Sequence, residues 1–435
     1  MAKQQVTSGL SKFGELKSRL MFLLGALIVF RFGAHIPVPG VDADALAKLY
    51  ESASGGILGM LNMFSGGSLE RFSIFAIGIM PYISASIVMQ LAAEIIPSLK
   101  ELKKEGDVGR KVIMKYTRLG TVLLATLQSF GVATFVYQQG IVVASQFEFY
   151  LSTVVCLVTG TMFLMWLGEQ ITERGIGNGI SLIITAGIVS GIPSGIIQLW
   201  TLTAEGSIGM LTSVGIVIGA LLLVVLVVFF EAAQRKIPIQ YAKRQFGLGG
   251  QQNTHLPFKL NMAGVIPPIF ASSIILFPST LFSWFGSGNS EGVLGKIATM
   301  LQHGQTLYIL LFAASIIFFC YFYTALTFSP KEMAENLKKS GAFVPSIRPG
   351  EQTSRYLEGV VLRLTFWGSI YITVICLIPE FLTSVLHVPF YLGGTSLLIL
   401  VVVTMDFSTQ IASYRMSHQY EQLMKRTDMK SLSRK

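Results

Sequence analysis

Stretches of about twenty apolar residues recur along the whole chain, and this is the length that a helix needs to cross the hydrocarbon core of a membrane. Only 13% of the 435 residues are charged, whereas about a quarter are charged in a soluble domain. The chain is therefore predicted to be an all-α polytopic membrane protein. Hydropathy and turn residues together predict ten transmembrane helices, at residues 20–37, 72–96, 114–136, 148–168, 178–200, 211–230, 260–285, 305–328, 360–382 and 392–412.

The basic residues predict how these spans are oriented. With a cytoplasmic N-terminus, 29 of the 33 Lys and Arg residues fall on the cytoplasmic side, and the exceptions are Arg31, Lys48, Arg71 and Lys296. Because cytoplasmic loops are the ones enriched in Lys and Arg, we expect both termini in the cytoplasm. The first apolar run continues to residue 37 without a small-residue cleavage site, which predicts an uncleaved first span.

Residues 57–91 carry an apolar segment that starts, breaks and starts again. The part before residue 64 is too short to span, residues 65–68 (Ser-Gly-Gly-Ser) predict a flexible break, and residues 72–91 are long enough to span. Broken backbone at membrane depth persists only where it is buried in protein or lines a wet cavity. The pattern therefore indicates a half-spanning helix beside a cavity; the alternative is an extracellular loop with some helix in it.

Two long loops, 231–259 and 329–359, are rich in basic residues and are predicted to face the cytoplasm. Such loops could dock an acidic partner surface or RNA. The alternative is that the positive-inside bias and attraction to anionic lipid explain every charge. Small and polar residues also interrupt the spans around Pro81, Gly177 and Asn261, and these mark helices that pack closely, kink or face water.

Other classes of function are disfavoured by the sequence. The glycine-rich run 175–179 lacks the GxxxxGK[ST] pattern, so no nucleotide binding is expected. Five His and three Cys are too scattered for a metal cluster, and no cofactor or enzymatic activity is predicted. Five carboxylates near span ends are predicted to reach the interface: Glu94, Glu169, Glu231, Glu380 and Asp406. A secondary transporter is the alternative, but it needs ion-coupling groups at the midplane, and isoleucine, serine and glycine stand there instead.

Five motifs closely resemble the SecY family (SecY/Sec61 alpha), the channel subunits of the bacterial protein-conducting translocon, over residue 15 to about 420. They lie at residues 78–87, 166–181, 261–267, 341–353 and 393–399. The resemblance implies two five-helix halves related by inverted pseudo-symmetry, 1–200 and 201–435, hinged near 201–210. It also implies that residues 57–71 form a half-spanning plug, which includes Asn62, Phe64, Ser65, Gly66 and Gly67.

The resemblance further implies a constriction and a lateral gate. The constriction is a ring of aliphatic side chains that falls here on Ile79, Ile83, Ile180, Ile184, Ile269 and Ile399. A four-residue separation in two pairs of these isoleucines supports the assignment, because residues four apart share one helix face. In the gate, the second and third spans face the seventh and eighth, and the gate residues are Ser86, Gln90, Asn261 and Ser272.

The partners follow from the same resemblance. The implied function is translocation of unfolded preproteins and lateral release of transmembrane segments into membrane lipid, driven by the SecA ATPase or the ribosome. SecE and SecG are the implied small subunits, and signal peptides and nascent chains the implied clients. Docking is expected at Arg235, Lys236, Lys243, Arg244 and Arg348. The loop tip 246–252 carries no charge, although relatives often carry arginine there.

Overall fold

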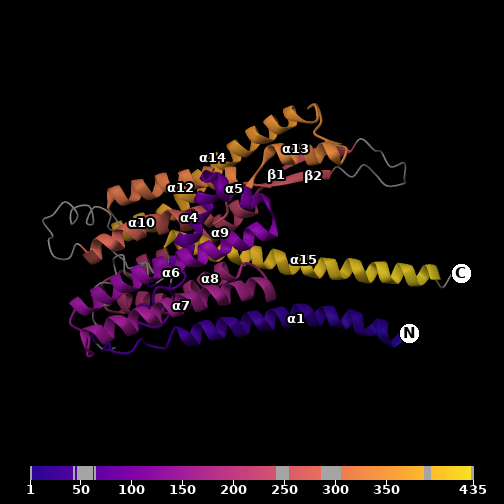
Figure 1. Ribbon diagram of the computed structural model, residues 1–435. Helices are drawn as coiled ribbons and strands as arrows, with labels where there is room; N and C mark the ends of the chain where they lie inside the picture. The colour runs from indigo at the N-terminus through magenta and orange to yellow at the C-terminus, as the bar shows by residue number, and fades with distance from the viewer. Residues whose placement is uncertain are drawn as a thin grey trace. The chain divides into compact units, whose positions relative to one another are not determined.

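The computed structural model describes residues 2–42, 45–46, 62, 65–241, 254–285, 305–386 and 393–432. Helices make up most of the described chain, and strands are few and short (Figure 1). In chain order the elements are α1 (Ala2–Gly33), α4 (Met80–Ile95), α5 (Pro97–Lys104), α6 (Asp107–Gln138), α7 (Gln146–Arg174), α8 (Gly179–Ala204), α9 (Met210–Ala232), β1 (Gln234–Tyr241), β2 (Thr254–Lys259), α10 (Ile266–Phe285), α12 (Thr306–Thr327), α13 (Pro330–Lys339), β3 (Ala342–Phe343), α14 (Glu351–Leu386) and α15 (Gly394–Leu432).

Seven helices among the described residues are long and apolar enough to cross a membrane, and the bent pair of α4 and α5 would add an eighth. The seven are α6, α7, α8, α9, α12, α14 and α15. The two remaining predicted spans coincide with α1 and α10, and α10 is apolar over Ile266–Ile275. The predicted all-α, multi-span architecture is therefore confirmed.

The described residues divide into two compact units. Unit 1 takes residues up to Gln198, together with 277–285 and 403–432, and unit 2 takes 199–241, 254–276, 305–386 and 393–402. The first boundary falls inside α8, between Gln198 and Leu199. The chain therefore passes from unit 1 to unit 2 within a helix rather than in the loop that follows it.

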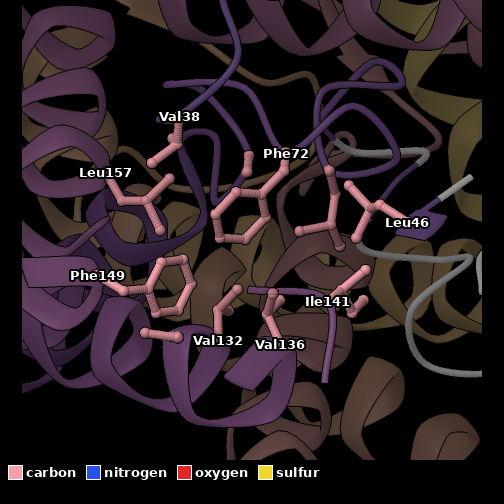
Figure 2. Packing of buried hydrophobic residues seen from close by; sticks show 11 residues of the cluster. Val38, Leu46, Phe72, Val132, Val136, Ile141, Phe149 and Leu157 are labelled. Carbon is pink, nitrogen blue, oxygen red and sulfur yellow. The ribbon is translucent and has the colours of Figure 1, made fainter. Parts of the chain in front are cut away.

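The core of unit 1 is centred on Phe72, which Figure 2 shows among apolar side chains from several segments. The Phe72 ring stacks on Phe149 of α7 with centroids 6.4 Å apart. Its carbonyl accepts the N–H of Val38 at 2.8 Å. Phe72 has a φ of 44°, a backbone conformation that costs a bulky residue about 1–3 kcal/mol. Burial of a whole phenylalanine side chain stabilises by a similar or larger amount, so the cluster can hold this backbone in place.

The predicted span 72–96 does not form one helix. Residues 72–79 form turns, since Phe72 and Gly78 (φ 64°) lie in the left-handed region, and α4 begins only at Met80. A bend of 97° then separates α4 from α5, where Ile96 takes an extended backbone before Pro97, as residues before proline prefer. The helix of this predicted span therefore begins eight residues later than expected, after a run of turns.

The helix α10 begins in the same way as α4. Gly264 also has a φ of 64°, and each helix starts two residues after its glycine. The nine residues 78–86 (GIMPYISAS) and 264–272 (GVIPPIFAS) are identical at the glycine, the proline, one isoleucine, the alanine and the last serine. This short internal repeat places Ile83 and Ile269 at equivalent positions of the two helices.

The two basic loops fold together into one small body of unit 2, which we call the platform: β1, β2, β3, α13 and the start of α14. The strand β1 pairs antiparallel with β2 from Gln234 to Ile239, and its last two residues pair with β3, where Gln240 lies opposite Phe343. Ile237, Phe258 and Leu357 are buried in its core. A strand from the first loop therefore shares a sheet and a core with the second loop.

Candidate functional site

Four of the six predicted ring isoleucines lie in unit 1. Ile79 and Ile83 stand at the start of α4 and are buried, with the N–H of Ile83 donating to the Ile79 carbonyl at 3.1 Å. Ile184 is buried on α8. Ile180, one turn earlier, is half-buried and lies against Gly168 of α7. Each pair thus occupies successive turns of one helix.

Unit 2 supplies the other two ring isoleucines. Ile269 on α10 is 8% exposed, and Ile399 on α15 is fully buried. Neither side chain has a hydrogen-bonding group, so both offer only apolar surface.

The described part of the predicted plug segment is a turn held by several hydrogen bonds. Asn62 holds it: the Glu70 N–H donates to Asn62 Oδ1 at 2.9 Å, and Asn62 Nδ2 donates to Glu70 Oε2 at 3.2 Å. The Asn62 carbonyl accepts the Gly67 N–H and the Ser65 hydroxyl. Asn62 and Ser65 are buried. The predicted break at residues 65–68 is therefore a hydrogen-bonded turn, while Phe64 and residues 57–61 and 63 lie outside the described residues.

The predicted gate residues lie on or beside the two repeated helices. Gln90 donates to Ser86 Oγ at 3.2 Å, and both side chains are half-buried on α4. Ser272 is buried on α10 and donates to the Ile269 carbonyl at 2.9 Å. Asn261 precedes α10, and its Oδ1 accepts the Gly264 N–H at 2.9 Å.

Asn261 also bonds one of the carboxylates that lie near predicted span ends. Its Nδ2 donates to Glu231 Oε2 at 3.1 Å, and Glu231 is only 3% exposed. The prediction that Glu231 reaches the interface was wrong, because α9 continues to Ala232 and packs this carboxylate inside unit 2. A carboxylate one residue beyond a predicted span end gave no sign of this burial.

Three of the predicted docking residues are described, and all three are exposed on the platform. Arg235 and Lys236 lie on β1 beside the buried Ile237. Arg348 lies in the turn between β3 and α14. Lys243, Arg244 and the uncharged tip 246–252 lie outside the described residues.

The turn that carries Arg348 is held from both sides. The buried Thr353 hydroxyl donates to the Arg348 carbonyl at 2.9 Å, and the Ile347 N–H donates to the Val344 carbonyl at 3.2 Å. Ser346 has a φ of 68°. The guanidinium of Arg348 therefore projects from a fixed backbone.

Comparison with known proteins agrees with this architecture. The SecY family model matches residues 73–408. The protein translocase subunit SecY of Pseudomonas aeruginosa is 56% identical over 434 residues, which cover 99% of this chain and 98% of that protein. The Escherichia coli K12 protein translocase subunit SecY is 56% identical over 443 residues and is matched over 100% of both chains.

Solved structures share the fold at low sequence identity. Two of them, described as "The structure of a protein conducting channel" and as a study of the plug domain of the SecY protein, have TM-scores of 0.68 and 0.67 at 18% identity. Sec61 in a canine ribosome-channel complex has a TM-score of 0.66, also at 18% identity. Each match covers 93% of both chains. With most of its length matched by the family model and whole relatives at 56% identity, this chain belongs to the SecY family of protein translocase subunits.

Proposed function

We propose that this translocase subunit is the protein-conducting channel of a bacterial cytoplasmic membrane. It passes unfolded preproteins across that membrane and releases transmembrane segments sideways into lipid. The SecA ATPase or the ribosome supplies the driving force, SecE and SecG complete the complex, and signal peptides and nascent chains are its clients. Both termini lie in the cytoplasm, which the distribution of basic residues supports.

The repeated start of α4 and α10 is the observation that carries this proposal. A left-handed glycine and a proline open each helix, and they give Ile83 and Ile269 the same register. One helix belongs to unit 1 and the described start of the other to unit 2. Two related halves, 1–200 and 201–435, each present a helix of this kind to a shared pore.

The ring isoleucines form the constriction of that pore. Branched apolar side chains fit around an extended chain of any sequence without hydrogen-bonding it, and they exclude ions by dewetting. The segment 57–71 closes the pore as a plug. The lateral gate uses Ser86 and Ser272, which also occupy equivalent positions of the repeat, together with Gln90 and Asn261.

The platform is the docking surface for the driving partners. Its exposed Arg235, Lys236 and Arg348 suit an acidic protein face or ribosomal RNA. Lys243 and Arg244 extend this basic surface along the sequence. Because β1 and β3 are paired, a partner meets the two loops as one body.

Cross-linking to a stalled preprotein tests the pore. Cysteines at Ile83 and Ile269 are compared with cysteines at Val88 and Ile274, which lie five residues further along each helix and are 58% and 41% exposed. The probe sits in the hydrophilic mature part of the preprotein, so that contacts of the signal peptide do not interfere. We expect adducts at the two ring positions and few at the other two. Equal labelling at all four would contradict a pore lined by this face.

A further inference from the structure

The carbonyl of Gly66, in the turn at the C-terminal part of the proposed plug, is held by side chains from two helices of unit 1, α1 and α8. Arg31, near the end of α1, donates from Nη1 to this oxygen at 3.0 Å. Ser190 of α8 lies with its hydroxyl 3.3 Å from the same oxygen. Its single proton is shared, since the Gly187 carbonyl lies closer, at 2.7 Å. Arg31 is therefore the stronger of the two donors.

Gly66 also touches the backbone of α8. A Cβ added at Gly66 would lie 2.8 Å from the Cα of Gly187, a distance at which one of the two backbones must move. Gly66 has a φ of 68°, which suits glycine and few other residues. The turn and α8 thus pack Gly66 against Gly187, too closely for a side chain at Gly66.

The turn is anchored again on its C-terminal side. The Ser73 N–H donates to the Ser68 carbonyl at 2.9 Å, and Phe72 is fixed in the apolar cluster of Figure 2. A movement of the plug that leaves this cluster intact has to separate Gly66 from α8. The bonds to the Gly66 carbonyl are the ones that such a movement breaks.

We propose that Arg31 is a positioning residue for the closed channel: its guanidinium on α1, aided by the Ser190 hydroxyl on α8, latches the Gly66 carbonyl to these two helices and so keeps the plug in place. The inference rests on the proposed assignment of 57–71 as the plug. A hydrogen bond from a charged donor shifts an equilibrium by about tenfold to a hundredfold. Loss of the latch should therefore raise the open fraction of a resting channel by about tenfold or more.

Two glycines provide a matched pair for the test. Gly66→Ala and Gly67→Ala place an alanine at φ values of 68° and 79°, so both strain the backbone similarly. Only at Gly66 does the new Cβ meet α8, whereas the space around Gly67 is open. Gly140→Ala is a second control. Gly140 lies in the turn between α6 and α7, has a φ of 70° and has open space around it, so this variant shows the effect of the same backbone strain at a position away from the plug.

Each variant is purified with its partner subunits, and ion leak through resting channels is measured in proteoliposomes. Export of a reporter with a defective signal sequence is measured in cells. We expect Gly66→Ala to raise both by about tenfold over Gly67→Ala, and Gly140→Ala to match the parent. If Gly66→Ala and Gly67→Ala leak equally, contact with α8 does not hold the turn and the latch is wrong.

Substitutions of Arg31 test the donor itself. We expect Arg31→Gln to leak and to export the defective reporter, Arg31→Lys to lie between it and the parent, and Ser190→Ala to have a smaller effect. Membrane level and export of a normal preprotein show that each variant folds. A variant that lacks residues 57–71 distinguishes the latch from the plug assignment. If this variant leaks ions but the Arg31→Gln channel does not, the latch is wrong and the plug assignment stands. If the variant that lacks 57–71 does not leak, the plug assignment itself is wrong.

Discussion

The side-chain amide of Asn261 donates to the Glu231 carboxylate across 3.1 Å, inside unit 2 and away from solvent. The same asparagine caps the left-handed Gly264 by accepting its N–H and donating to its carbonyl at 3.2 Å. One residue therefore joins the end of α9 to the turn that sets the start of α10. The register of Ile269 depends on that turn.

Asn261→Ala should destabilise the protein. It removes three hydrogen bonds in a buried place, where losing one partner costs about 1–3 kcal/mol, so we expect a loss of about 2–4 kcal/mol after partial relaxation. Thermal unfolding in detergent and the level of protein in the membrane measure it. Lys236→Ala, on the exposed face of β1, should leave both unchanged. An Asn261→Ala protein as stable as the parent would show that the bond to Glu231 contributes little.

The turn between α8 and α9 should not be the hinge of the channel. Thr203 and Ser213 are joined by a hydroxyl hydrogen bond of 2.6 Å across it, and the Ile208 N–H donates to the Leu202 carbonyl. The boundary of the two units lies earlier, after Gln198, and Pro193 interrupts the hydrogen bonding of α8 just before it. We therefore expect bending near Pro193.

A disulfide distinguishes the two positions. Cysteines at Thr203 and Ser213 should oxidise readily, since their side chains already touch, and export should be the same in the oxidised and reduced states. Pro193→Ala, which restores a helical hydrogen bond, should slow export severalfold without loss of protein. Export blocked by oxidation and restored by reduction would place the hinge in the turn instead.

Arg348→Glu should reduce SecA-driven secretion about tenfold or more while the protein stays in the membrane. The planar guanidinium suits an acidic surface, and the reversed charge repels it. Thr353→Ala should give a smaller defect, because the hydroxyl only fixes the Arg348 carbonyl. Arg355→Glu, on an exposed residue one turn into α14, serves as a charge-matched comparison. Secretion assays with inverted membrane vesicles measure all three.

Ile269→Asn and Ile399→Asn should make the channel less selective. A buried aliphatic side chain contributes about 1.5–3 kcal/mol, so an asparagine in the ring should weaken the closed state by about 1–3 kcal/mol. We expect both variants to export proteins whose defective signal sequences the parent rejects. Ile274→Asn, on the exposed face of α10, should impair insertion instead. Ring variants that discriminate as strictly as the parent would rule out the ring as the gate.

Hydropathy predicted the membrane-spanning helices well because burial in lipid and burial in protein select the same residues. The limits of α12 (Thr306–Thr327) agree with the predicted 305–328 to within one residue. The same signal failed at residues 72–79, where the sequence stays apolar but Phe72 and Gly78 take positive φ. Backbone handedness leaves no trace in a hydropathy profile, so the start of α4 could not be placed from it.

The candidate site was predictable only in part, for a related reason. Motif positions are enough to predict the ring isoleucines and the role of Arg348, because these predictions depend on residue identity alone. The contacts of Gly66 with Arg31 and Ser190 join residues 35 and 124 positions apart, and nothing local in the sequence marks them. The pairing of β1 with β3 was missed likewise, since β3 has only two residues.

The helix α14 starts three residues after Arg348 and runs without a break from Glu351 to Pro379. At 1.5 Å per residue this is about 43 Å, more than the thickness of the hydrocarbon core. Near its far end, Ile375 and Cys376 lie directly against Gly394, the first residue of α15, so closely that no side chain fits between them. Ile399 follows five residues later. A partner bound at Arg348 would therefore contact the chain at the start of α14, a long unbroken helix. The far part of that helix packs against the start of α15, which carries Ile399, so a displacement of α14 would be transmitted to this predicted ring residue.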